Sequence, residues 1–131
     1  MGVTVLLDTH ALLWALLSPA RLSSRARSLL VDPATNLLVS PVSALEIATK
    51  HRLGKLAGVA PVILGYASHL ATLGARELPV LSSHALLAGQ FTVPHRDPFD
   101  RLLAAQAIVE GVPLLTSDTQ MPQFPGLVIY W

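Results

Sequence analysis

The sequence predicts an α/β fold: a central, mostly parallel sheet of about four to five strands with helices on both faces. Short apolar runs of strand length alternate along the chain with longer helical segments, which is typical of βαβ units. The first run, residues 3–7, is apolar and partly β-branched and therefore indicates a strand that is buried on both faces. Because no repeat, low-complexity tract or linker divides the 131 residues, a single domain over 1–131 is expected.

The first half of the chain contains two predicted strands, and clear signals bound the helices around them. Asp32-Pro33 ends the second helix, because proline cannot continue one. Ser40 is a good N-cap, Pro41 suits the first helical position, and Gly54 closes that helix. The expected order is strand 3–7, helix 11–17, helix 22–31, strand 37–39 and helix 41–53.

In the second half of the chain strands and helices continue to alternate, and glycine and proline mark their ends. Gly74 follows a helix, and Ser82 or Ser83 caps a small one. Asp97-Pro98 opens a long helix that Gly111 closes. The expected order is helix 62–73, strand 76–78, helix 82–87, an irregular segment 89–96, helix 98–110, strand 114–116 and strand 127–130.

Composition restricts the class of protein. The chain is 52% hydrophobic and 13% charged, which argues against disorder, and its net charge of +1 gives no general field for binding nucleic acid. The lack of cysteine excludes disulfides and thiolate zinc sites. The start of the chain has no signal-peptide pattern, and no apolar run reaches the roughly 18 residues that span a bilayer. We expect a soluble, cytoplasmic protein without a membrane association.

Four acidic residues are expected at one edge of the sheet. Asp8 directly follows the first strand, and Asp118 follows the strand at 114–116. Glu46 lies in the second turn of the helix after Ser40, and Asp100 lies in the first turn of its own helix. Because ligands bind outside the carboxyl ends of parallel strands, the four side chains are predicted to gather there.

Clustered carboxylates repel one another, and a divalent cation reverses that balance. Mg²⁺ and Mn²⁺ prefer oxygen ligands, and such a site activates water and stabilises charge on a phosphoryl group. The acids therefore point to metal-dependent hydrolysis of a phosphodiester bond.

Each acid also has a purely structural interpretation. Asp8 and Asp97 suit helix N-caps, and Asp100 would then favour the dipole of its helix. Glu46 alone is more often a solvated helix residue, and Asp118 suits a turn. Taken singly, most favour the structural interpretation; taken together, four of only 8 acids are harder to explain that way.

Four segments carry a resemblance to the PIN-domain ribonucleases, most closely to the VapC-type toxins of prokaryotic toxin–antitoxin pairs. In the family's order they are LDTH (7–10) with Trp14 behind it, SALEI (43–47) followed by 50–56, HRDPFDR (95–101) leading to 104–107, and LTSD (115–118). The resemblance implies a three-layer PIN-like fold and an endoribonuclease that is held inactive by a cognate antitoxin protein. It implies that Asp8, Glu46, Asp100 and Asp118 form a catalytic Mg²⁺ or Mn²⁺ site acting on an RNA substrate.

Within that resemblance Asp100 is preferred to its neighbour Asp97. Asp100 stands seven residues before Ala107, as the family's third acid stands before its helix alanine. Asp97 is kept as a cap or as a group that supports the site without binding the metal.

Several other residues are candidates for supporting roles. Thr9, Thr116 and Ser117 could orient a carboxylate or a metal-bound water, although turn and strand-end hydroxyls often only bond backbone. Arg101 is the best placed of the cations to contact a nucleic-acid backbone, although surface solvation is the default for such residues. The apolar stripes of helix 11–17 and of 63–73 suit a homodimer face, an antitoxin groove or simply the core.

Two other functions stay open. An aspartate-nucleophile phosphotransfer or phosphatase domain also places an aspartate after the first strand, but such phosphatases usually repeat the aspartate where this chain has His10. A catalytically silent RNA- or protein-binding module on the same scaffold is the other, and the intact acids speak against it.

Overall fold

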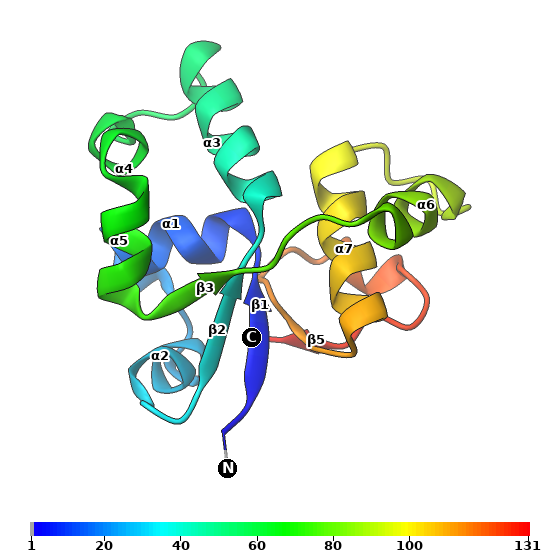
Figure 1. Cartoon of the computed structure of the whole chain (residues 1–131), viewed down its shortest axis with the longest axis horizontal. Coiled ribbons are helices and arrows are strands. Elements are labelled where there is room, and N and C mark those ends of the chain that lie inside the picture. Colours follow the sequence, from blue (N-terminus) through cyan, green and yellow to red (C-terminus); the bar gives the residue numbers. More distant parts are fainter. Residues whose placement is uncertain (1) are drawn as a thin grey trace.

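A five-stranded parallel sheet forms the centre of the protein, whose computed structural model describes residues 2–131 (Figure 1). The strand order is β3-β2-β1-β4-β5, so β1 is the middle strand and pairs with both β2 and β4. The strands are β1 (Thr4–Leu7), β2 (Asn36–Val39), β3 (Ala75–Glu77), β4 (Leu114–Leu115) and β5 (Ile129–Tyr130). This confirms the predicted α/β class, with every strand pair parallel.

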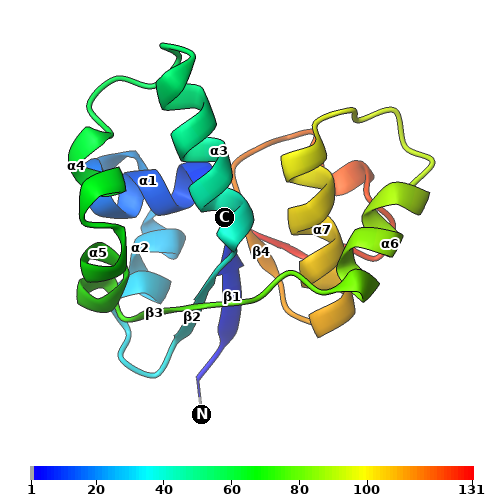
Figure 2. The ribbon, with the colours of Figure 1, turned by 45° about the horizontal axis from the view of Figure 1, so that its top comes forward.

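Helices cover both faces of the sheet, in the three layers that were expected (Figures 1 and 2). They are α1 (Thr9–Leu17), α2 (Ser24–Val31), α3 (Pro41–Arg52), α4 (Ala60–Leu64), α5 (Tyr66–Leu73), α6 (Ser82–Gln90) and α7 (Pro98–Glu110), with short 3₁₀ turns at Pro19–Arg21 and Met121–Gln123. In both views α6 and α7 lie on one side of β1, and α1, α2, α4 and α5 lie on the other.

Two hydrophobic clusters sandwich the sheet because successive strand residues point to opposite faces. Val5 and Leu7 of β1 pack with α1, α2 and α5, whereas Leu6 between them packs with α7 and Phe124. All three β1 side chains are fully buried. The middle strand is thus enclosed on both faces, as its apolar sequence predicted, and its carboxyl end leads to Asp8.

Several helix boundaries differ from the sequence prediction; α1, for example, begins at Thr9 and not at residue 11. The helix expected from Leu22 begins at Ser24, because Ser23 caps it by accepting a hydrogen bond from the Ala26 N–H. The helix expected over 62–73 is broken at Gly65 into α4 and α5. The short helix expected to end at residue 87 continues to Gln90 as α6.

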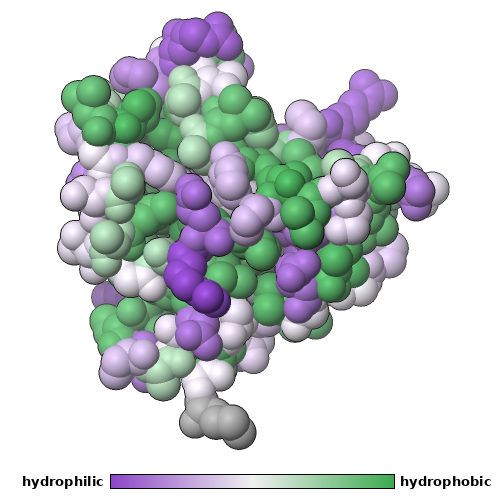
Figure 3. Space-filling view, viewed as in Figure 1, coloured by the Kyte–Doolittle hydropathy of each residue, from purple (hydrophilic) through white to green (hydrophobic). Residues whose placement is uncertain are grey.

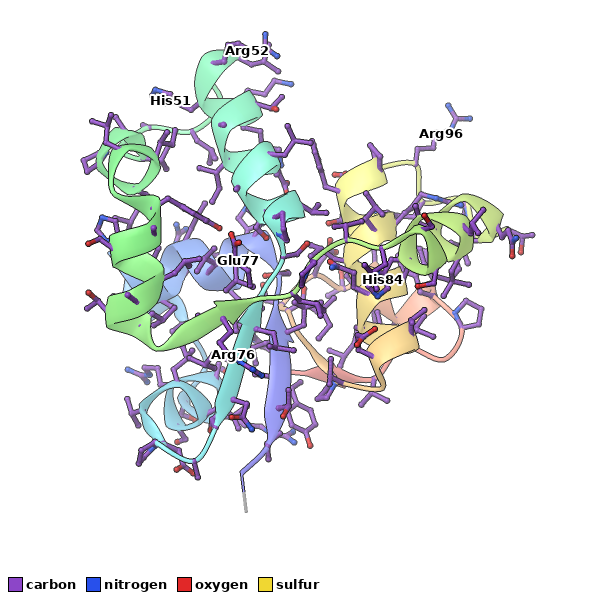
Figure 4. All side chains as sticks on the ribbon, in the orientation of Figure 1. His51, Arg52, Arg76, Glu77, His84 and Arg96 are labelled. Carbon is purple, nitrogen blue, oxygen red and sulfur yellow. The ribbon has the colours of Figure 1, made fainter. Side chains whose placement is uncertain are left out.

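The start of α6 uses a histidine in place of the predicted serine cap. His84 is fully buried; its Nδ1 accepts a hydrogen bond from the Leu81 N–H, and its Nε2 lies 3.0 Å from Glu110 Oε2 at the end of α7. Figure 4 shows His84 between these two helices. The cap thereby joins α6 to α7, a tertiary contact that local sequence does not reveal.

The expected ends of α3 and α7 are confirmed. Ser40 Oγ accepts from the Val42 N–H, and Asp97 Oδ1 accepts from the Phe99 N–H at 2.9 Å. Gly111 ends α7 at a φ of 67°, a left-handed conformation that glycine adopts without strain. Within residues 2–131 no helix combines the length and the apolar character that crossing a bilayer requires.

Replacing Leu103 by alanine tests the packing of α7 on the sheet. Leu103 is 0% exposed in the cluster around Leu6 and Phe124, so Leu103→Ala is expected to lower the free energy of unfolding by about 3 kcal/mol, measured by urea denaturation. Val109 lies on the same helix and is 44% exposed, so Val109→Ala is the matched control, with a change within about 0.5 kcal/mol. Equal effects of the two substitutions would contradict this packing.

Candidate active site

Asp8 occupies the carboxyl end of the middle strand and caps the helix that follows. Its Oδ1 accepts a hydrogen bond of 2.7 Å from the Ala11 N–H, and its own N–H donates to the Leu115 carbonyl of β4. The side chain is nevertheless almost completely buried, at 8% exposed. Asp8 is therefore a helix N-cap, as the structural interpretation predicted, and it is also a buried carboxylate at the predicted edge of the sheet.

Burial makes the charge of Asp8 costly. Desolvation raises the pKa of Asp8 to about 6, against the hydrogen bonds from Thr116 and from Ala11 and the nearby His10, which act to lower it. The charge of Asp100 adds to the rise in the pKa of Asp8. Asp100, 92 residues away in sequence, is therefore close enough to interact with Asp8 electrostatically.

Glu46 is the second buried carboxylate, at 3% exposed on the inner side of α3. Each of its oxygens has a partner: Oε1 lies 2.6 Å from Thr9 Oγ1, and Oε2 lies 2.5 Å from Lys50 Nζ. Thr9 Oγ1 also lies 3.0 Å from Ser43 Oγ. These contacts join the first residue of α1 to α3 and fix the orientation of the Glu46 carboxylate.

Asp100 enters the site from the first turn of α7. Burial raises its pKa, the hydrogen bond with His95 acts to lower it, and the charges of Asp97 and Glu46 raise it further. The Oδ2 atom of Asp100 lies 2.8 Å from His95 Nε2. In both ribbon views α3 and α7 stand on either side of the carboxyl end of β1, which is how Glu46 and Asp100 approach Asp8 (Figures 1 and 2).

Lys50 is the cation within this group of acids. Partial burial acts to lower its pKa, but the hydrogen bond and charge of Glu46, with smaller contributions from Asp97 and Asp100, leave the pKa of Lys50 above its usual value. The structure therefore brings Asp8, Glu46 and Asp100 into one electrostatic group. Asp97 joins the group while also capping α7.

Asp118 stands apart from this electrostatic group. It is exposed in the loop after β4, where its Oδ1 accepts a 2.9 Å hydrogen bond from the Gln120 N–H. Its own N–H donates to Thr116 Oγ1 at 3.1 Å. Across residues 2–131, no set of three or more acidic or histidine side chains is already gathered in a metal-binding arrangement.

The supporting residues divide into two sets. Thr9 and Thr116 are both buried: Thr9 bonds Glu46 at 2.6 Å, and the Thr116 hydroxyl acts to lower the pKa of Asp8. Ser117 is exposed. Arg101 requires a correction: its guanidinium donates four hydrogen bonds to backbone carbonyls of α6 and of the loop before α7, so most of its donors are used inside the protein and not left for a nucleic-acid backbone. Those carbonyls belong to Ala88, Phe91, Val93 and His95.

Sequence reasoning missed two features of the site. The Glu46–Lys50 pair had a readable signal, because residues four apart on a helix face each other. The contact of His95 with Asp100 had no such signal in the sequence, since it depends on how the loop before α7 folds back onto this helix. Figure 4 shows that the neighbouring Arg96, by contrast, points away from the body of the protein, as does Arg52 at the end of α3.

Comparison with known proteins adds independent information. The PIN domain matches residues 5–127. The chain is 33% identical over 133 residues, 98% of each chain, to Ribonuclease VapC22 of Mycobacterium tuberculosis (strain ATCC 25618 / H37Rv).

Solved structures share the fold at low identity. The crystal structure of VapBC2 from Rickettsia felis bound to a promoter DNA fragment matches with a TM-score of 0.70 and 14% identity over 98% of each chain. A toxin–antitoxin complex from Klebsiella pneumoniae matches with a TM-score of 0.57 and 15% identity over 95% of each chain.

Replacing Asp8 by asparagine is expected to stabilise the metal-free protein. The pKa of Asp8 rises on folding, so its favourable contribution is present at low pH and is lost as the pH rises through about 6. Asparagine keeps the cap and carries no charge. Asp8→Asn should therefore gain up to about 3 kcal/mol at pH 8 and almost nothing at pH 4, measured by urea denaturation with chelator.

The exposed Asp118 provides the control for this measurement, since Asp118→Asn removes a solvated charge and should give no such gain. A gain from Asp8→Asn that is equal at pH 4 and pH 8 would show that buried charge is not its cause.

Removing Lys50 tests the pairing of Glu46. Lys50→Met leaves a buried carboxylate without its cation and should cost about 1–3 kcal/mol of unfolding free energy at pH 7. Adding Glu46→Gln should recover most of that loss, which a double-mutant cycle measures. Arg52→Met, at an exposed position on the same helix, is the control, and an equal loss there would contradict the assignment.

Proposed function

The chain belongs to the PIN-domain family, and from this membership we propose that it is a VapC-type ribonuclease, the toxin of a toxin–antitoxin pair. The observation that carries the proposal is the approach of two buried carboxylates, Asp8 at the end of β1 and Glu46 of α3, and the half-buried Asp100 of α7 at one edge of the sheet. The 33% identity to Ribonuclease VapC22, which extends over 98% of both chains, supports cleavage of RNA as the reaction. The residues that we propose for catalysis are Asp8, Glu46, Asp100 and Asp118.

The donor set suits a hard divalent cation, Mg²⁺ or Mn²⁺. Every proposed ligand is a carboxylate, and PIN ribonucleases are typically metal-dependent. The raised pKa values of Asp8 and Asp100 point to acids whose charge is incompletely compensated by the protein itself. We propose that Asp8, Asp100 and Asp118 hold the cation, which when bound activates water and stabilises charge on the scissile phosphate.

The protein's own residues supply orientation. Thr9 and Lys50 fix the two oxygens of Glu46, so this carboxylate is held ready either to join the ligands or to orient the attacking water. Thr116 accepts the N–H of Asp118, and its hydroxyl acts to lower the pKa of Asp8, so it is placed to influence two of the proposed ligands.

Partners follow from the family and from the surface. We propose that an antitoxin protein and a second copy of the chain cover apolar side chains that the fold leaves in solvent, such as Leu64 of α4 at 89% exposed. Figure 3 shows apolar residues spread between polar ones over one face. The alternatives of a phosphotransfer domain and of a silent binding module gain no support from the comparisons.

An RNA cleavage assay tests the proposal. Purified protein should cleave RNA when Mg²⁺ or Mn²⁺ is present, lose activity in chelator and regain it on return of the metal. Asp100→Asn is expected to lower kcat/KM by about 100-fold or more, because it removes a proposed ligand. Asp97→Asn keeps an N-cap three residues away and should lower it far less. Cleavage that survives both the chelator and Asp100→Asn would refute the assignment.

A further inference from the structure

The loop that carries Asp118 is joined to Asp100 by two side chains that no comparison assigns. His95 Nε2 lies 2.8 Å from Asp100 Oδ2, and His95 Nδ1 lies 3.1 Å from Gln120 Oε1. The Gln120 N–H in turn donates to Asp118 Oδ1 at 2.9 Å. A hydrogen-bonded path therefore leads from α7 to the exposed aspartate.

The same loop is tied to Asp8 from its other end. The Asp118 N–H donates to Thr116 Oγ1 at 3.1 Å, and the Thr116 hydroxyl acts to lower the pKa of Asp8. Hydrogen bonds thus lead from Thr116 through Asp118, Gln120 and His95 to Asp100. Removing either end would free an exposed loop whose position the proposed site depends on.

His95 is held in place independently of these polar contacts. Its side chain is only 9% exposed, and its ring lies edge-on to Phe124 with the centroids 5.5 Å apart. The carbonyl of His95 accepts a 2.9 Å hydrogen bond from Arg101. The ring and the backbone of His95 are therefore both held in position before any ligand binds.

The link does not require one charge state of the ring. A neutral imidazole that donates from Nε2 to Asp100 can accept at Nδ1 from the Gln120 amide NH₂ when that amide is turned over, so that its nitrogen and not Oε1 faces the ring. An imidazolium can donate from both nitrogens, to the Asp100 carboxylate and to the Gln120 amide oxygen.

We propose that His95 and Gln120 are positioning residues that fix the loop of Asp118 against Asp100. This inference rests on the proposed function, in which Asp118 joins Asp8 and Asp100 in holding the cation. Groups that orient metal ligands without touching the metal change metal affinity by about 10–100-fold, so a loss of that size is expected when the link is cut.

Gln120→Ala is the first test, because Gln120 is exposed and its removal leaves the core intact. In metal-free protein, hydrogen exchange of the Asp118 and Gln120 amides should become faster, and Mn²⁺ affinity, titrated by electron paramagnetic resonance, should fall about 10-fold. Gln123→Ala is the matched control: Gln123 bonds the Gln120 carbonyl but does not reach His95, so it should leave Mn²⁺ affinity unchanged. His95→Ala should reproduce both effects of Gln120→Ala.

A double-mutant cycle separates positioning from a general loss of structure. In an Asp118→Asn background, Gln120→Ala should cause no further loss of Mn²⁺ affinity, because the residue acts through Asp118. An undiminished loss in that background, or wild-type exchange and affinity in Gln120→Ala, would overturn the inference while leaving the nuclease intact. Failure of the wild-type protein to bind Mn²⁺ would instead overturn the proposed function.

Discussion

A carboxylate at the end of a strand that is buried on both faces is the constraint on which the site depends. β1 is the middle strand, and the strand order changes direction beside it, between β1 and β4. Open α/β sheets bind ligands at this topological switch point, because the connections leave to opposite faces and open a crevice there. Asp8 occupies that position, and α3 and α7 bring Glu46 and Asp100 to it from the two sides.

Charge in this crevice is balanced by side chains of the protein. Lys50 compensates Glu46, His95 bonds Asp100, and Asp8 has only the dipoles of Thr116 and Ala11 with the nearby His10. Burial therefore dominates at Asp8, and its pKa rises to about 6. Such sites trade stability for function: the charge that opposes folding is the charge that would attract a cation.

Local signals account for most of what the sequence predicted. Ser40, Asp97 and Gly111 act within one helical turn of themselves, so helix ends could be read directly. The apolar run 3–7 predicted a buried strand, and Asp8 directly after it was therefore expected at the carboxyl end of the sheet. Topology and family resemblance predict the four acids as one set, and neither shows that the side chain of Asp118 lies in solvent.

What could not be predicted depends on tertiary contacts. The break at Gly65, the histidine cap of α6 and the link from His95 to Gln120 each join segments whose approach only the complete fold determines. Arg101 shows the difference most clearly, because its neighbour Asp100 suggested a role toward ligand. Consecutive residues of a helix point about 100° apart, so one side chain of that turn faces the sheet edge while the next faces the loop.

One turn of α7 consequently performs three tasks. Asp97 caps the helix, Asp100 projects into the acidic group, and Arg101 gathers the carbonyls of the preceding loop. Because His95 belongs to that loop and bonds Asp100, the arginine acts on the acidic group indirectly, by fixing the backbone of its histidine. Arg101 thus helps to position the acidic group although its own side chain points away from it. The spacing of residues in the HRDPFDR segment therefore reflects the geometry of this helical turn as much as the chemistry of its acids.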